Sequence, residues 1–241
     1  MRSGVFADVH GNLAALAAIV ADGQVNGVDS WVCLGDVAFR GPQPAECAEM
    51  VARLPGIIQI AGNTDLWLSI GFPATLQVAE ERRKYLEVYR VWGRQRLNGP
   101  QLATLRNLPL THLQQYGSDT VMFTHAAPGS PEAWIPANAD EDTFSPLWEG
   151  HLAEVVCSGH IHVPYLRRLH GRLLINTGSV GHPTDGDNRA SYVIISDEGG
   201  AASVQFKRVR YNVAATVAAA QECGLPLADA YAQALQAAQT L

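Results

Sequence analysis

Basic residues are a minority in this 241-residue sequence. It contains 17 lysines and arginines against 23 aspartates and glutamates, which gives a formal net charge of −6 without a basic tail. Because nucleic acids and anionic membranes attract clustered positive charge, this composition argues against stable binding to either. It leaves a phosphate-bearing substrate open, since bound metal ions can supply local positive charge.

Long apolar segments are also absent. The longest apolar run, 13–21 (LAALAAIVA), is too short to span a bilayer. The first residues lack the basic region and the long apolar region of a signal peptide. We therefore expect a cytoplasmic protein that does not contact membranes.

Cysteine is scarce, and none of the four cysteines lies in a Cys-x-x-Cys pair. Cys33 and Cys157 lie inside apolar, strand-like runs, which predicts buried thiols instead of disulfides or zinc ligands. Hydrophobic residues make up 47% of the chain and charged residues 17%, which is typical of a globular protein with a sizeable core.

The order of apolar runs predicts an α/β fold. Strands are expected at 4–9, 30–36, 56–63, 120–126, 154–160, 172–178, 190–196 and 203–211. Helical patterns lie at 12–22, 43–53, 75–93, 99–107, 213–223 and 226–240. The early alternation of strand and helix predicts parallel strands with crossover helices. After residue 154 the strands follow one another closely, which predicts antiparallel hairpins.

We expect one domain over residues 1–241. The stretch 66–110 interrupts the alternation with two helices and no strand, so we interpret it as a helical insertion beside the site. The alanine-rich stretch 212–241 predicts two covering helices. A homodimer contact through these helices is an open alternative.

Polar side chains close the first five apolar runs of the predicted fold. They are Asp8, His10, Asp36, Asn63, His125, His160 and His162. Because sites in open α/β sheets form at the carboxyl ends of the strands, we expect these side chains to gather in one place. Two of them, Asp8 and His10, are two residues apart, which points both to one face of a strand.

This donor set indicates a metal site. Two aspartates, one asparagine and four histidines suit borderline divalent metals such as Mn, Fe, Zn or Co. Seven donors exceed the needs of one tetrahedral ion, and they divide between two ions if one carboxylate bridges them. Asp36 is the natural bridge because it stands alone on a middle strand. Two such ions lower the pKa of a shared water and clamp both oxygens of a phosphoryl transfer.

In combination these motifs resemble the calcineurin-like metallophosphoesterase superfamily. The matching segments are ADVHG, GDVAFRG, GNTD, a lone His125 and GHIH, and they cover residues 6–162. The later segment 176–195 (NTGSVGHPTDGDNRASYVII) is similar to the N-P-G-S-V-G segment of the small bacterial phosphodiesterase branch. The resemblance implies a four-layer α/β/β/α sandwich of two mixed sheets, with a dimetal site at the strand ends.

The resemblance also implies roles for single residues. It assigns the first metal to Asp8, His10, Asp36 and His162, and the second to Asp36, Asn63, His125 and His160. A hydroxide that bridges the metals would attack phosphorus, with Asp36, Arg40 and Asn63 as the catalytic residues. We expect two divalent ions, Mn first, with Fe, Zn, Ni, Co or Mg as alternatives.

Three residues are candidates for substrate contacts. Arg40 can fork onto phosphate oxygens. Thr64 stands where many phosphatases of the superfamily have a histidine; it can donate a hydrogen bond to phosphate but cannot act as an acid of matched pKa. Asp65 is expected to anchor this turn through nearby backbone. His182, in SVGHP, is the third candidate.

The aromatic residues of the insertion divide into two groups. Tyr85, Tyr89 and Trp92 have helical spacing and are expected in the core. Trp67, just past the GNTD segment, is the better candidate for stacking on a base or aryl group. The remaining histidines that we assign to the surface are His112, His151 and His170.

These observations favour a two-metal phosphoesterase that acts on a small phosphoester or nucleotide-type substrate, with phosphodiesters preferred. One alternative is a phosphomonoesterase, a protein-phosphatase-like enzyme or a dinucleoside polyphosphate hydrolase, because GDVAFRGP resembles the matching segments of such enzymes. Another is a non-catalytic interaction scaffold, because one retromer subunit resembles the same branch. A nucleic-acid-binding module would need the basic patches that the sequence lacks.

Overall fold

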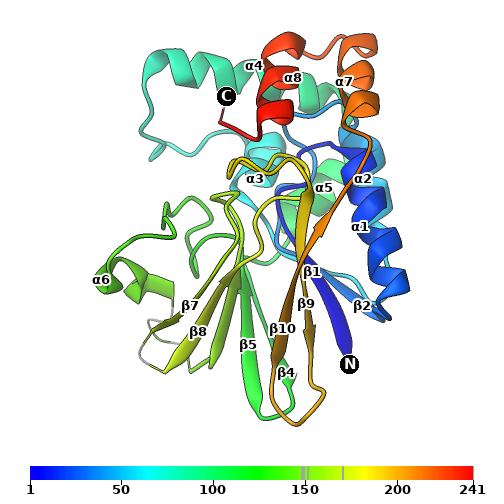
Figure 1. The fold of residues 1–241 in the computed structure, drawn as a ribbon. Helices are drawn as coiled ribbons and strands as arrows, with labels where there is room; N and C mark the ends of the chain where they lie inside the picture. The colour runs from blue at the N-terminus through cyan, green and yellow to red at the C-terminus, as the bar shows by residue number, and fades with distance from the viewer. Residues whose placement is uncertain (148–149, 151, 170, 241) are drawn as a thin grey trace.

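Two five-stranded sheets pack face to face in the computed structural model, which describes residues 1–147, 150, 152–169 and 171–240 (Figure 1). The first sheet has the order β10-β9-β1-β2-β3, formed by β1 (Arg2–Phe6), β2 (Ser30–Cys33), β3 (Ile58–Gln59), β9 (Ala190–Ser196) and β10 (Ser203–Val209). The second has the order β4-β5-β6-β8-β7, formed by β4 (Thr111–Tyr116), β5 (Asp119–Thr124), β6 (Val155–Ser158), β7 (Tyr165–Leu169) and β8 (Arg172–Asn176).

Both sheets are mixed, as predicted. In the first, β1, β2 and β3 are parallel, and the hairpin of β9 and β10 joins antiparallel to β1. In the second, β5, β6 and β8 are parallel, while β4 and β7 run antiparallel to their neighbours. The expectation of only antiparallel hairpins after residue 154 is therefore wrong for β6 and β8, because β7 lies between them in sequence and at the sheet edge in space.

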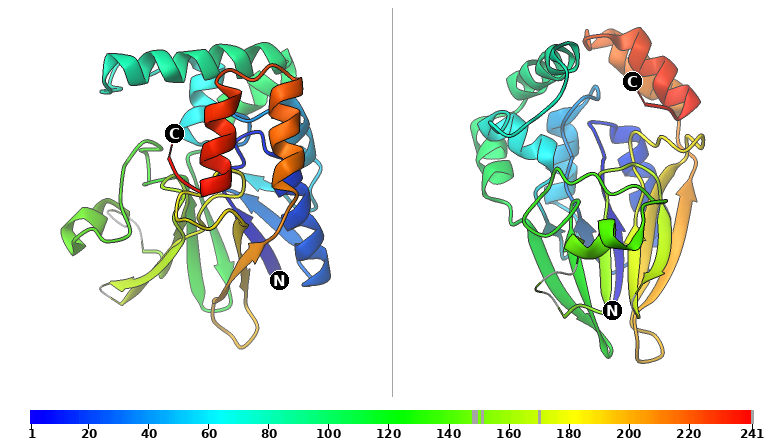
Figure 2. Two further views of the ribbon diagram at one scale, coloured as in Figure 1. Left: turned by 45° about the horizontal axis from the view of Figure 1, so that its top comes forward. Right: turned by 90° about the vertical axis from the view of Figure 1, so that its left-hand side faces the viewer.

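Helices cover the outer faces and extend beyond the strand ends. They are α1 (Leu13–Val25), α2 (Pro44–Ala52), α3 (Asn63–Ile70), α4 (Glu80–Arg96), α5 (Gly99–Asn107), α6 (Glu141–Phe144), α7 (Val213–Glu222) and α8 (Ala228–Ala237), with a 3-10 turn at Ser145–Leu147. Figure 2 shows α4 and the two C-terminal helices beyond the same end of the sheets. In the described ranges, none of the helices combines the length and the apolar character needed to cross a membrane.

Four apolar clusters hold the layers together. Val5, Val32 and Phe123 belong to the cluster between the two sheets. A second cluster joins α1 and α2 to the first sheet, and a third packs α6 and its neighbouring loop on the second sheet. These three clusters define the four layers α/β/β/α. The fourth cluster, the helical cluster, joins α3, α4 and α5 to α7 and α8 through residues such as Leu68, Tyr89 and Leu235.

The described residues also settle several smaller expectations. Cys33 and Cys157 are buried free thiols. Tyr89 and Trp92 are buried in the helical cluster, and the half-buried Tyr85 packs against it. His112 is half-buried in β4. The remaining two surface assignments, His151 and His170, lie outside the described residues.

The segment GNTD begins a helix, which the sequence analysis did not predict. Asn63 is the first residue of α3, so the region expected to hold two helices contains three. The Asp65 carboxylate caps this helix by accepting a hydrogen bond from Gly62 N at 3.0 Å. A helix therefore starts directly behind the donor Asn63 and fixes its backbone.

Candidate metal centre and adjoining cavity

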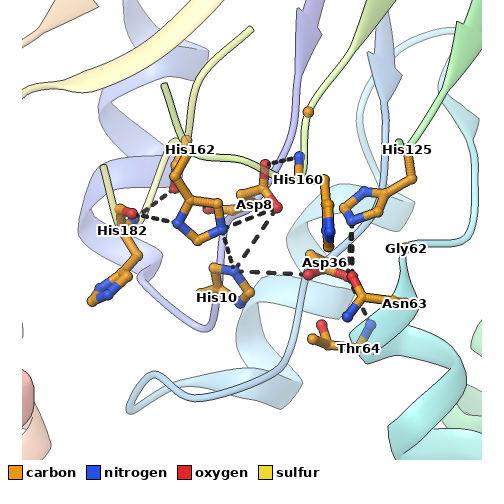
Figure 3. Close-up of polar contacts among 12 residues, drawn as sticks. Asp8, His10, Asp36, Gly62, Asn63, Thr64, His125, His160, His162 and His182 are labelled. Atoms are coloured by element: carbon orange, nitrogen blue, oxygen red, sulfur yellow. Dashed lines mark hydrogen bonds and ion pairs between the residues drawn. The ribbon is translucent and has the colours of Figure 1, made fainter. Parts of the chain in front are cut away.

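All seven predicted donors come together beyond the ends of β1, β2, β3, β5 and β6 (Figure 3). The strands end early: β1 stops at Phe6, so Asp8 and His10 lie in the following loop. The prediction that Asp8 and His10 share one face of a strand is therefore wrong, although their side chains do converge. Parallel strands bring their successive loops to one edge, and this topology positions the donors.

The loops that carry the donors adopt an unusual backbone. Asp8, His10, Asp36, His160 and His162 have φ between 47° and 71°, and the φ of Arg40 is 78°. Non-glycine residues rarely adopt this left-handed region, and each costs roughly 1–3 kcal/mol. Backbone bonds between loops hold it in place, including Asp8 N to Gly35 O and His10 N to Asp36 O, both 3.0 Å. Such strained positions concentrate at functional sites.

The first donor group consists of Asp8, His10 and His162, whose nearest donor atoms lie within 4.8 Å of one another. The Nε2 atoms of His10 and His162 are 3.0 Å apart. Asp8 Oδ1 is 3.4 Å from His162 Nε2 and 3.8 Å from His10 Nε2. Burial and the neighbouring His162 lower the pKa of His10 well below its ordinary value, which keeps that ring neutral and able to donate a lone pair.

The second donor group contains Asp8, Asp36 and His125. Asn63 Oδ1 lies 3.0 Å from His125 Nε2. Asp36 spans both groups, since its Oδ1 is 3.6 Å from His125 Nε2 and its Oδ2 is 3.8 Å from His10 Nε2. This is the position that a bridging carboxylate requires. Asp8 is also shared by the two groups, which the sequence analysis did not anticipate.

His160 lies at the open side of the second group. Its ring is 5.1 Å from the His125 ring, centroid to centroid, and its backbone N–H donates to Asp8 Oδ2 at 2.9 Å. Burial lowers the pKa of His160 to about 3, so its ring is neutral at pH 7. It lies outside both of the close donor groups.

Backbone carbonyls fix the tautomers of two rings. His125 Nδ1 donates to Leu34 O at 2.7 Å, and His162 Nδ1 donates to His182 O at 2.6 Å. In the neutral ring each Nε2 then carries a lone pair, which faces a carboxylate oxygen. Lone pairs that face each other in a buried site require a positive charge between them. The donor set therefore fits a divalent cation.

Electrostatics at the second group agree with this. Burial lowers the pKa of His125, but the carboxylates of Asp36 and Asp8 raise it above the ordinary value. Burial raises the pKa of Asp36. Both directions reflect negative charge crowded into a buried environment.

Asp65 anchors the donor loops, as predicted. Its carboxylate accepts hydrogen bonds from Asp36 N at 2.7 Å and Val37 N at 3.1 Å, in addition to Gly62 N. Asp36 Oδ1 in turn accepts from Thr64 N at 2.9 Å. Only glycine fits at position 62, because a Cβ there would lie 2.1 Å from Asp36 Oδ1. These contacts orient Asp36 from three sides.

A cavity of about 230 Å³ opens next to the donors. Arg40 lines it and is only 9% exposed, yet it has no carboxylate partner among the residues that the structure describes, and its Nε donates to no acceptor. Thr64 also lines it, and its buried Oγ1 has no partner. Both side chains therefore offer unused hydrogen-bond donors beside the donor cluster.

The third candidate contact, His182, is buried in the cavity wall, and neither of its ring nitrogens has a partner. Its ring stacks on Tyr231 of α8 at 6.2 Å and 13°. Its carbonyl holds His162, so the residue supports the metal centre through its backbone and faces the cavity with its side chain.

The cavity contains residues that the sequence analysis missed. Arg82 of α4 and Trp134 of the loop after β5 line the cavity, and the Tyr231 ring stacks on the His182 ring. No motif marks them, because helix and loop packing brings them there. Trp67 lines the cavity as expected, but it is 6% exposed and its ring packs edge-on against Phe39 and Phe72.

A two-sheet α/β sandwich with buried Asp, Asn and His donors at its loop ends is the architecture of a metallophosphoesterase, and sequence comparison agrees. The profile of the calcineurin-like phosphoesterase superfamily domain matches residues 1–199. The uncharacterized protein MJ0912 of Methanocaldococcus jannaschii is 30% identical over 226 residues, which cover 87% of each chain. The chain belongs to the calcineurin-like phosphoesterase superfamily, and the recognition made from its motifs is confirmed.

Solved structures show the same fold. A metallophosphoesterase from Sphaerobacter thermophilus is 30% identical, with a TM-score of 0.79 over 99% of both chains. A hypothetical protein from Pyrococcus horikoshii is 18% identical, with a TM-score of 0.80 over 94% of both chains.

We predict that Asp36→Asn weakens metal binding at both donor groups. The amide keeps an oxygen that can accept from Thr64 N, but the shared negative charge is lost. Metal affinity should fall by more than the roughly 10- to 100-fold that loss of an outer-sphere partner costs. Mass spectrometry of bound metal after Mn²⁺ loading is the measurement, with the exposed Asp142→Asn as control. Wild-type occupancy of both ions in Asp36→Asn would contradict the bridging position.

Proposed function

We propose that this protein is a metal-dependent phosphoesterase that hydrolyses phosphodiesters. The observation that carries the proposal is Arg40, a nearly buried guanidinium without a carboxylate partner in the described structure, on the wall of a cavity that Asp36 and Asn63 also line. A buried guanidinium is costly unless an anion pairs with it. Phosphate matches the planar fork of arginine.

Two divalent ions would be held by the donors assigned above: Asp8, His10, Asp36 and His162 for one, and Asp36, Asn63, His125 and His160 for the other. When bound, they supply Lewis-acid activation of water and neutralise the charge of the phosphoryl group. The protein's own residues perform the remaining tasks. Arg40 binds the non-bridging phosphate oxygens, and the Thr64 hydroxyl donates a further hydrogen bond to them.

The preference for diesters follows from the missing acid at Thr64. Without an acid, the leaving oxygen must depart as an anion or take a proton from water. A monoester of a poor leaving group suffers most from this, because positioned acid catalysis is typically worth roughly 10²–10⁴-fold. The cavity also has apolar walls formed by Phe39, Leu86 and Ile161, which suit an organic substituent on the far side of the phosphate.

The direct test of the proposal is metal-dependent turnover. We expect bis(p-nitrophenyl) phosphate to be hydrolysed faster than p-nitrophenyl phosphate, because both release the same activated leaving group and only the diester has a second aryl group for the apolar walls of the cavity. Activity should be lost after chelation and restored by Mn²⁺, Fe²⁺ or Zn²⁺. A higher rate on the monoester would favour the phosphomonoesterase. Hydrolysis of dinucleoside polyphosphates alone would favour a dinucleoside polyphosphate hydrolase. No turnover with any metal would favour an interaction scaffold.

Arg40 provides a second prediction. Arg40→Lys and Arg40→Ala should bind metal normally, because the guanidinium is not a metal ligand, and should lower kcat/KM by roughly 10- to 1000-fold. Arg40→Lys should lose less kcat/KM than Arg40→Ala, since lysine keeps the positive charge but not the planar guanidinium group that binds two phosphate oxygens. Arg53→Ala, at an exposed position after α2, serves as control. Rates equal to wild type for both variants would place Arg40 outside the reaction.

Thr64 provides a third prediction. The wild-type rate should depend steeply on the pKa of the leaving group, and Thr64→His should flatten that dependence by raising the rates on alkyl esters. Both oxygens of Asp65 already accept backbone N–H bonds, so the new imidazole has no orienting carboxylate there. The gain should therefore lie near the low end of roughly 10²–10⁴-fold.

The measurement is a series of aryl and alkyl phosphodiesters of graded leaving-group pKa. Thr64→Ser, which keeps the hydroxyl, is the control and should follow the wild type. A shallow wild-type dependence would mean that another group, such as His182, already supplies the proton.

A further inference from the structure

Trp134 differs from the other tryptophans that the structure describes. It is 63% exposed, whereas Trp31, Trp67 and Trp92 are between 2% and 6% exposed. Exposed tryptophan leaves a large apolar surface in water, and tryptophan is enriched at interfaces, where one side of its ring meets a partner. Its place in the fold decides what it could bind.

Trp134 stands at the junction of the cavity and the metal centre. It lines the cavity that contains Arg40 and Asp36, and its ring meets the ring of His160 in a T-shaped contact at 5.7 Å. A phosphoester bound by Arg40 would therefore share the cavity with the Trp134 ring. The cavity thus combines a cationic wall with an exposed aromatic ring.

The loop that carries Trp134 is fastened on both sides. On one side, Trp67 Nε1 donates to Glu132 Oε1 at 2.8 Å. On the other, Arg167 of β7 donates to the carbonyls of Ala137 and Ala139, at 3.2 and 2.6 Å from one guanidinium nitrogen. A loop held at both ends presents its tryptophan at low entropic cost, which favours binding.

We propose that Trp134 determines substrate specificity by stacking on a planar aromatic group of the phosphoester. The inference rests on the proposed phosphoester site and specifies its substrate class as esters that carry a planar ring. Trp134, and not Trp67, is the stacking surface, because the ring of Trp67 is already packed between Phe39 and Phe72. Arg40 binds the phosphate in this arrangement, and the ring selects the substituent.

The test uses two phosphonates of nearly equal size, phenylphosphonate and cyclohexylphosphonate, whose P–C bonds resist hydrolysis. Binding to the Mn²⁺-loaded protein is measured by calorimetry, so no turnover is needed. Since stacking on an aromatic side chain is typically worth about 5-fold or more in affinity, the wild type should prefer the planar ring by at least about 5-fold. The cyclohexyl ring has no π-face to stack, so the difference between the two affinities reports the stacking contribution.

Trp134→Ala should abolish this preference by lowering the affinity for phenylphosphonate more than the affinity for cyclohexylphosphonate, whereas Trp134→Phe should retain part of it. Phe206→Ala, which removes an exposed aromatic ring of β10, is the control and should behave as the wild type. An unchanged preference in Trp134→Ala would overturn the inference. A Trp134-dependent preference in a protein without phosphodiester turnover would preserve the inference and refute only the proposed reaction.

Discussion

Crowding of buried lone pairs at the strand ends is the constraint on which the rest of the structure depends. The Nε2 atoms of His125 and His162 face carboxylate oxygens at 3.6 and 3.4 Å, and all of these side chains are buried or nearly buried. Such an arrangement is unfavourable unless a cation compensates it. The surrounding fold therefore has to hold the donors together against their own repulsion.

Three devices supply that restraint. Carbonyls of Leu34 and His182 hold two rings in one tautomer and one direction. The Asp65 carboxylate gathers three backbone N–H groups around the loop of Asp36. Left-handed backbone at most of the donors turns their side chains inward, and close glycine contacts such as Gly62 leave room for it. Each device involves backbone atoms. These backbone contacts hold the donor loops in their strained, left-handed conformation.

The donors were the most predictable part of the molecule, because each follows an apolar run and most of these segments contain a glycine next to a donor. Local patterns also predict most strands and helices, whereas their arrangement in two mixed sheets was implied by the resemblance to the superfamily. They failed for β4 and β7, whose sequences THLQQY and YLRRL alternate polar with apolar residues at sheet edges and lack continuous apolar runs. They failed for Arg82 and Trp134 because only packing between distant elements brings these side chains to the cavity.

The helical cluster and the core between the sheets are separate bodies of apolar contacts. The donor loops emerge from the core between the sheets, whereas Phe39, Trp67 and Leu86 on the cavity wall belong to the helical cluster. Substitutions in α4, which carries none of the donors, can therefore reshape the cavity while the candidate metal centre keeps its geometry. In the course of evolution, proteins with this fold can diverge in substrate while they inherit an unchanged reaction, and sequence similarity confined to the donor motifs would not reveal that divergence.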